Sequence, residues 1–324
     1  MNKTWLIIKR EYITRVRNRT FIISTFLTPL FFVGLITAVI YMTPKDRALP
    51  GTINDAEIVK EKIEKKEHSG VAYAVGYTSS FLIYITILIY GTMVMRGVSE
   101  EKTNRIAEII ISSVKPFQLM MGKIIGIGAV GLTQFFMWIV LVVVFTLVLF
   151  NFLPHDVLNE ASRQTTEQQS AGFGTELATV NIPMIIFCFI FYFIFGYLFY
   201  ASLFAAVGSA VSEDSQDTQS LMLPVTMPIV LAIVIMMQVI VHPSSRMATW
   251  TSMVPFFSPV VMMARIPFGV PSTVPWWELA SSMLLLVGGF LFTTWLSAKI
   301  YRTGILLYGK KITWKEMWKW TVRS

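Results

Sequence analysis

Six long apolar runs, separated by polar segments, dominate the chain. Each is about 20 residues or longer, which is the length a helix needs to cross the hydrocarbon core of a bilayer. None carries Asp, Glu, Lys or Arg in its interior, whereas core helices of a soluble protein would show charged faces. The pattern predicts an all-α membrane protein with six transmembrane helices, at about 22–42, 76–96, 124–150, 183–207, 221–241 and 279–298.

Amphipathic segments flank these spans at both ends of the chain. In residues 1–21, Trp5, Ile8, Tyr12 and Val16 recur at steps of three and four, which predicts a helix lying in the membrane interface. In the tail, residues 299–324, Trp314 and Trp318 lie among lysines. Aromatic rings anchor at headgroup depth. The predicted anchors at the two ends are Trp5, Tyr12, Trp314 and Trp318.

The stretch RGVSEEKTNRIAEIIISSVKPFQLMMGK, residues 96–123, is charged and lies between two spans. Glu101 and Arg105 are four residues apart, so they can pair along one face of a helix, with isoleucines on the other. Lys115 precedes Pro116, which disfavours a helical backbone at the lysine and allows a new helix to begin at the proline. Taken alone, these residues favour an interfacial linker, with its apolar face in lipid and its charges in water.

The segment 242–278 is apolar, rich in proline and too short to cross the bilayer twice. It predicts a re-entrant or interfacial helix around Val260–Ile266, with Pro259 at its start and Pro267 beyond its end. The alternative is a tightly packed loop anchored by aromatic residues. In either case, the predicted anchors are Trp276 and Trp277.

Composition and charge support this assignment and add an orientation. Hydrophobic residues make up 54% of the 324 residues and charged residues 14%, which is typical of membrane proteins. With the N-terminus inside, the inner segments hold 18 of the 27 lysines and arginines, so both termini are expected in the cytoplasm. The net charge of +8 is split among juxtamembrane segments, which predicts contact with anionic lipid headgroups rather than nucleic acid.

Most site chemistry is excluded by the residues themselves. The single cysteine, Cys188, lies in a span, and the three histidines are far apart without ligand spacing, so neither a disulfide nor a metal site is expected. No catalytic constellation appears. Gly122 and Gly126 form a G-x-x-x-G pair, which permits close helix packing and is equally compatible with packing inside the chain and with subunit association.

Three blocks resemble the permease subunits of type 2 ABC exporters, most nearly the NatB-like group associated with sodium efflux. They are RGVSEEKTNRIAEIIISSVKPFQLMMGKIIG, SEDSQDTQSLMLPVTMPIVL at 212–231, and FSPVVMMARIPFG at 257–269. The resemblance implies a single permease domain over residues 1–324 with a cytoplasmic coupling region at 97–116. The outer segment 43–75, in which EIVKEKIEKKE at 57–67 predicts a short separate helix, is short for this group, which leaves any outer-domain function in doubt and would also be expected of a shortened form.

What the resemblance implies about partners is specific. Segment 98–113 would be a coupling helix that docks on a separate ATP-binding subunit, and a second permease, identical or different, would complete the exporter in a bacterial cell membrane. The expected coupling contacts are Glu100, Glu101, Arg105, Glu108 and Ile109. An acidic inner loop offers a possible second contact, or a solvated helix cap, through Glu213, Asp214 and Asp217.

This chain contains no G-x-x-x-x-G-K-[ST] motif, because Gly122 and Lys123 are followed by isoleucine without the upstream glycine. We therefore expect no cofactor on this chain and no enzymatic site; ATP and Mg²⁺ would bind the partner.

The substrate that the resemblance implies is sodium, yet the spans show no carboxylates for a cation, and a lipid, peptide or drug-like substrate suits them as well. Two other classes stay open. One is an intramembrane protease, because residues 100–105 match E-E-x-x-x-R, although no span holds a histidine; the other is a non-transporting scaffold or sensor.

Overall fold

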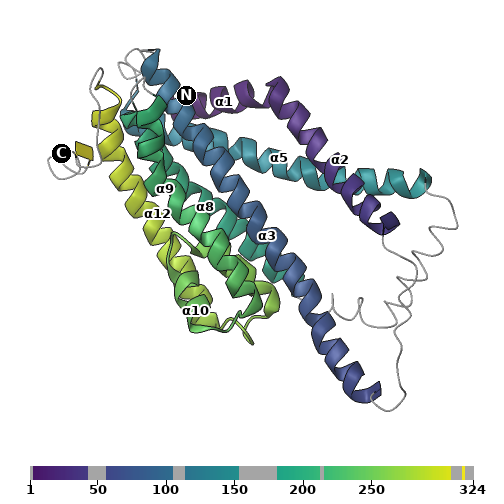
Figure 1. Ribbon diagram of the computed structural model, residues 1–324. Helices are drawn as coiled ribbons and strands as arrows, with labels where there is room; N and C mark the ends of the chain where they lie inside the picture. The colour runs from purple at the N-terminus through teal and green to yellow at the C-terminus, as the bar shows by residue number, and fades with distance from the viewer. Residues whose placement is uncertain are drawn as a thin grey trace. The chain divides into compact units, whose positions relative to one another are not determined.

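The computed structural model describes residues 3–42, 56–104, 114–152, 181–211, 215–307 and 316–317. All regular structure in these ranges is helical, which confirms the predicted all-α class (Figure 1). Among the described residues, five helices are long and apolar enough to cross a membrane. They cover Ala72–Thr103, Pro116–Phe145, Ile182–Ala210, Gln219–Val241 and Trp276–Gly304.

The N-terminal region holds two helices. Helix α1, Lys3–Val16, corresponds to the predicted interfacial helix. It ends before residue 21, where the predicted segment 1–21 ended. Helix α2, Arg19–Met42, contains the predicted span 22–42 and is not among the five. Because most side chains beyond residue 30 of α2 lie outside the described set, the sixth span stays a prediction.

The second predicted span is the middle of a much longer helix. Helix α3, Ala56–Thr103, has 48 residues, so the lysine- and glutamate-rich segment expected as a separate short helix in the 43–75 loop is instead its first part. Charged residues with good helix propensity precede the span with no proline between, and the helix continues through Gly70 into the span. Helix α5, Pro116–Phe152, begins at the proline, as predicted.

Two compact units can be distinguished, and each is described on its own. The first comprises residues 1–13, 72–129 and 181–324. Its central element is α8, Ile182–Ala210, which buries large residues such as Tyr192, Tyr200 and Phe204. Besides parts of α3 and α5, this unit holds α9, Ser215–Val241, and α12, Trp276–Gly304, and α8 packs against both.

Glycines allow α8 to pack closely against its neighbours. A Cβ atom at Gly208 would lie 2.5 Å from the carbonyl oxygen of Met95 in α3, and one at Gly304 would lie 2.9 Å from that of Ser209. Only a residue without a side chain fits such backbone contacts. The ends of α3, α8 and α12 are therefore closely packed at one end of the unit.

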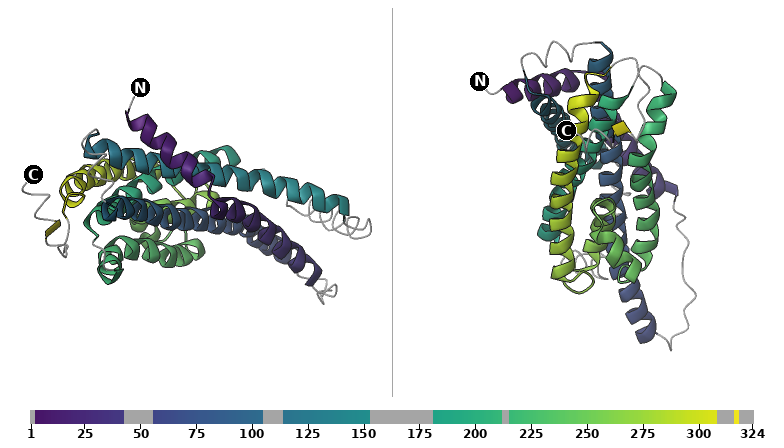
Figure 2. Two further views of the ribbon diagram at one scale, coloured as in Figure 1. Left: turned by 90° about the horizontal axis from the view of Figure 1, so that it is seen from above. Right: turned by 90° about the vertical axis from the view of Figure 1, so that its left-hand side faces the viewer.

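Two short helices lie at the opposite end, between α9 and α12 (Figure 2). Helix α10, Arg246–Met253, is capped by Ser245, whose hydroxyl accepts a hydrogen bond from Ala248 N at 3.2 Å. Helix α11, Ser258–Arg265, has Pro259 in its first turn and is followed by the 3₁₀ turn η1, Ile266–Phe268. The helix predicted around Val260–Ile266 is thus present, and all eight residues of α11 are buried.

The second unit comprises residues 14–71 and 130–180. Asn18 caps α2, accepting a hydrogen bond from Thr20 N at 3.0 Å. A side-chain hydrogen bond between described residues links its helices, from Gln134 Nε2 of α5 to Ser24 Oγ of α2 at 3.3 Å. Along its helices many exposed side chains are large and apolar, including Ile23, Phe136 and Leu147, which is the surface expected of helices in lipid.

Candidate functional site

Four charged side chains from three helices meet where α1 packs against α3 and α5. We call Arg10, Glu11, Glu101 and Lys123 the α1 cluster. Lys123 Nζ of α5 lies 3.1 Å from Glu11 Oε1 and 3.0 Å from Glu101 Oε1, and also donates to the Gly97 carbonyl at 3.1 Å. Arg10 pairs with both glutamates, at 2.9 Å from Glu11 Oε1. The two positive charges balance the two negative ones.

Burial differs within the α1 cluster. The Lys123 side chain is 2% exposed and that of Arg10 48% exposed. Partial burial lowers the pKa of the Arg10 guanidinium, but hydrogen bonds and charge from Glu11 and Glu101 outweigh this and raise its pKa above the ordinary value. Within the described residues, Glu101 Oε2 is buried without a hydrogen-bond partner, so the polar groups of the cluster are not all satisfied.

The G-x-x-x-G pair, Gly122 and Gly126, lies next to this cluster, in contact with α1. A Cβ atom at Gly122 would lie 2.7 Å from Ile7 Cγ2, and one at Gly126 would lie 2.8 Å from Glu11 Cβ and 3.1 Å from the Ile8 carbonyl oxygen. Helix α1 therefore rests on the backbone of α5. Of the two interpretations that the sequence left open, packing inside the chain is present at these glycines.

The residue after Glu101 joins a further helix. Lys102 Nζ donates to the carbonyl oxygen of Ser209 at 2.6 Å, and the lysine is buried. Ser209 is in the last turn of α8, where carbonyl groups lack partners within the helix and the helix dipole favours a positive charge. Glu101 and Lys102 thus connect the end of α3 to α1, α5 and α8.

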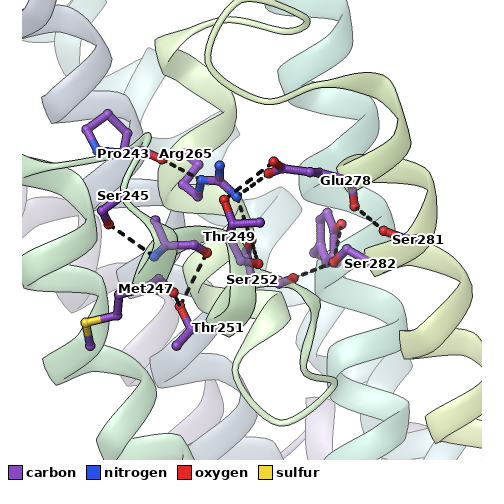
Figure 3. A network of polar contacts seen from close by, with 12 residues as sticks. Pro243, Ser245, Met247, Thr249, Thr251, Ser252, Arg265, Glu278, Ser281 and Ser282 are labelled. Atoms are coloured by element: carbon purple, nitrogen blue, oxygen red, sulfur yellow. Dashed lines mark hydrogen bonds and ion pairs between the residues drawn. The ribbon is translucent and has the colours of Figure 1, made fainter.

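A second buried group of charges lies at the other end, and we call it the α10 network: Tyr192, Ser252, Arg265, Glu278 and Ser282. Arg265 is 1% exposed. It donates to Pro243 O at 2.8 Å and to Ser252 Oγ at 2.6 Å, and its Nη1 lies 2.8 Å from Glu278 Oε2 (Figure 3). The hydroxyl of Ser282 donates to Ser252 O at 2.7 Å, and Tyr192 donates to Ser282 Oγ at 3.0 Å.

The expected coupling residues separate into exposed, buried and undescribed ones. Glu100 is exposed, whereas Glu101 is buried in the α1 cluster. Arg105, Glu108 and Ile109 lie outside the described residues, as do Glu213 and Asp214 and the side chain of Asp217. The contacts of all these residues with an ATP-binding subunit stay predictions.

The expected anchors are described in part. Trp5, Trp276 and Trp277 are exposed, which suits residues that insert into a headgroup layer. Tyr12 is half-buried, and Trp314 and Trp318 lie outside the described residues. The face of α1 that carries Trp5 does not pack on α5. The face that packs on α5 carries Ile7 and Glu11.

The sequence interpretation did not single out Glu11, Lys102, Lys123 or Glu278 as interacting residues. The interiors of the expected spans carry no charge, but the helices extend past the expected boundaries, and Glu101, Lys102, Lys123 and Glu278 lie buried in these extensions. One signal was available. Glu11 is the only acidic residue among the basic ones of residues 1–21, and an isolated acid in a segment that otherwise selects for positive charge suggests a specific basic partner.

No group of three or more His, Cys, Asp or Glu that could hold a metal ion occurs in the portion of the chain that the structure describes. The charges of both buried groups are paired with opposite charges. The geometry is that of structural joints between helices.

Comparison with known proteins identifies relatives of this chain. A family model described as ABC-2 family transporter protein matches residues 47–299. The chain is 32% identical over 259 residues to the uncharacterized protein YhaP of Bacillus subtilis (strain 168), covering 80% of this chain and 58% of YhaP.

A second relative is the uncharacterized protein MJ1024 of Methanocaldococcus jannaschii, 27% identical over 270 residues, covering 83% of this chain and 59% of that protein. The chain thus matches less than two thirds of the length of either relative. No solved structure matches it.

Proposed function

Because this chain belongs to the ABC-2 family of transporter proteins, we propose that it is the multi-pass permease subunit of an ATP-driven exporter that works with a separate ATP-binding subunit. The absence of a phosphate-binding G-x-x-x-x-G-K-[ST] motif from the sequence supports a separate motor. ATP and Mg²⁺ bind that partner, and this chain has no catalytic site of its own. Two permeases and two ATP-binding subunits make up the complex.

The observation that carries the proposal is the anchoring of the end of α3. Segment 98–113 is the proposed coupling helix, and its beginning is fixed by Glu101 to α1 and α5 and by Lys102 to α8. A load on this segment therefore reaches several helices at once, because separating any of them would leave a buried charge unpaired. An interfacial linker would need no such anchoring.

The proposed topology places this end of the bundle in the cytoplasm of a bacterial cell. The distribution of lysines and arginines favours six spans with both termini inside. The α10 network then lies at the outer end, where α10 and α11 form a packed cap and exposed Trp276 and Trp277 meet the outer headgroups.

For the substrate, the resemblance to the NatB-like group favours sodium export. A second candidate is a lipid, peptide or drug-like molecule. It is favoured because Glu101 and Glu278, which lie within the candidate spans, are each neutralised by a basic side chain. A cation site of high charge needs carboxylates that are not already paired.

Co-purification and reconstitution test the function together. The tagged chain, isolated from native membranes in mild detergent, is expected to retain an ATP-binding subunit. Vesicles containing the pair are expected to show ATP-dependent movement of radioactive sodium or of a fluorescent lipid.

Three outcomes contradict the proposal. An isolated chain that binds no ATP-binding subunit excludes the coupled transporter. A bound subunit with no flux of either probe favours the scaffold or sensor. Peptide cleavage by the chain alone favours the intramembrane protease.

A further inference from the structure

Helix α1 is joined to the rest of the first unit by more than apolar contact. It rests on Gly122 and Gly126 of α5, where added Cβ atoms would lie 2.7 Å from Ile7 Cγ2 and 2.8 Å from Glu11 Cβ. At this separation, sliding α1 along α5 by one residue would drive side chains into the α5 backbone. The steric fit therefore fixes the register of the two helices.

The charges fix the same register from a different direction. Lys123 Nζ is held between Glu11 of α1 and Glu101 of α3, at 3.1 Å and 3.0 Å, although these residues are far apart in the sequence. Lys123 is almost fully buried, so a shift of α1 that broke its pair would leave an ammonium and a carboxylate desolvated and unpaired. Such a shift costs far more than an exchange of surface ion pairs.

These contacts rest on helix ends next to the segment that the proposed function assigns to coupling. Glu101 lies two residues before the end of α3, and Lys123 lies in the second turn of α5. Glu101 thus lies near the start of segment 98–113, and Lys123 lies just beyond the connection from that segment to α5. An element joined to both residues follows them whenever that segment is displaced.

We propose that α1, the end of α3 and the beginning of α5 move as one rigid block during the transport cycle, with Glu11 and Lys123 as the positioning residues that prevent α1 from sliding over α5. The inference rests on the proposed function, because it describes how movement of the coupling segment reaches the spans. In the competing arrangement, α1 is a hinged element that swings over α5 in each cycle.

A disulfide between α1 and α5 separates the two arrangements. Ile7→Cys and Gly122→Cys are combined with Cys188→Ala, which removes the single native cysteine. A Cβ at residue 122 would lie 2.9 Å from Ile7 Cβ, and Ile7→Cys also removes the Cγ2 atom that such a Cβ would contact. Disulfides join Cβ atoms about 3.8 Å apart, so a shift of less than about 1 Å suffices.

The measured quantity is ATP hydrolysis by the assembled complex, relative to the isolated ATP-binding subunit, with the bond oxidised and then reduced. The rigid block predicts rates within about twofold of each other, since a bond inside a block restrains no necessary motion. The single Ile7→Cys variant in the Cys188→Ala background reports any direct effect of the oxidant.

Adding Lys123→Gln to the same variant completes the test. Loss of the ammonium is expected to lower the stimulated rate at least about fivefold when the cysteines are reduced, and oxidation is expected to restore it, because the disulfide replaces the ionic joint. Should Lys123→Gln fail to insert, the pair with native Lys123 remains decisive.

A hinged α1 gives the opposite result. Oxidation would then inhibit hydrolysis about tenfold or more, and reductant would restore it; this outcome overturns the rigid block, as would full stimulation in reduced Lys123→Gln. The proposed function fails separately, when no ATP-binding subunit assembles with the unmodified chain.

Discussion

The α1 cluster and the α10 network both bury a basic side chain against glutamate, but they join different parts of the chain. The α10 network connects mainly residues between Pro243 and Ser282, with Tyr192 of α8 as a more distant member, and its arginine has a carboxylate, a hydroxyl and a carbonyl as acceptors. The α1 cluster joins residues 112 positions apart, and one of its bases, Arg10, is half exposed. The α10 network thus holds together residues mostly from one stretch of the chain. The α1 cluster instead connects distant helices beside the proposed coupling segment.

This difference indicates separate tasks. A network in which the Arg265 guanidinium meets a carbonyl, a hydroxyl and a carboxylate stabilises the short helices α10 and α11 and has little reason to rearrange. A cluster that reaches the surface through Arg10 can be influenced by whatever binds there. If the comparison is correct, variants of the α10 network change mainly stability, and variants of the α1 cluster change both stability and coupling.

The largest effect is expected from Arg265→Met. It leaves Glu278 buried without its cation, which should lower the free energy of unfolding by about 3–5 kcal/mol. The melting temperature of the purified protein in detergent measures the loss. Arg246→Met, at an exposed position on the neighbouring helix α10, should leave the melting temperature nearly unchanged. Equal melting temperatures for both variants would show that the ion pair between Arg265 and Glu278 does not stabilise the protein.

Lys123→Met is expected to have the next largest effect, lowering the free energy of unfolding by about 2–4 kcal/mol. The loss is smaller than for Arg265→Met because Arg10 still neutralises part of the charge of Glu11 and Glu101. The double variant Lys123→Met with Glu11→Gln should recover part of this loss, since it removes the stranded carboxylate as well. A thermodynamic cycle built from the melting temperatures of the single and double variants measures the coupling. Strictly additive effects would mean that the two side chains do not interact.

Gly126→Ala is expected to cost about 1–3 kcal/mol, because the new methyl group would meet Glu11 Cβ at 2.8 Å and α1 would have to move away. Gly288→Ala is the matched control, since nothing lies within 4 Å of a Cβ there; it should be neutral or slightly stabilising through helix propensity. Limited proteolysis within α1, together with the melting temperature, reports its detachment. A stable Gly126→Ala protein with protected α1 would show that the close packing is dispensable.

The smallest effect on stability is expected from Glu100→Lys, at an exposed residue beside the buried Glu101. It should leave the melting temperature unchanged while weakening binding of the ATP-binding subunit about three- to tenfold, as expected for a charge at the rim of an interface. Glu101→Gln should do the reverse, lowering the melting temperature while the subunit still binds. Titration with the purified subunit and thermal unfolding distinguish the two variants. Identical behaviour of both would contradict the assignment of Glu100 to partner binding and of Glu101 to stability.

Much of this architecture is readable from the sequence because it depends on local patterns. Uninterrupted apolar runs indicate spans, and Pro116 and Pro259 mark where α5 and α11 begin, since proline is tolerated in the first turn and disfavoured further in. The lengths of the helices were less accessible. Helix α3 continues through a polar segment that carries no apolar signal, so the sequence predicted only a short helix there, separate from the span.

The sequence by itself determined the class of protein: a helical chain that crosses the membrane several times, since bilayer thickness and backbone hydrogen bonding leave few ways to arrange such apolar runs. Only the tertiary structure decided which charges are buried and with whom. Glu100 and Glu101 are chemically identical neighbours, yet one is exposed and the other meets Lys123 and Arg10. Such pairing joins residues that lie far apart in the sequence, and it depends on how helices pack, which no local pattern of residues specifies.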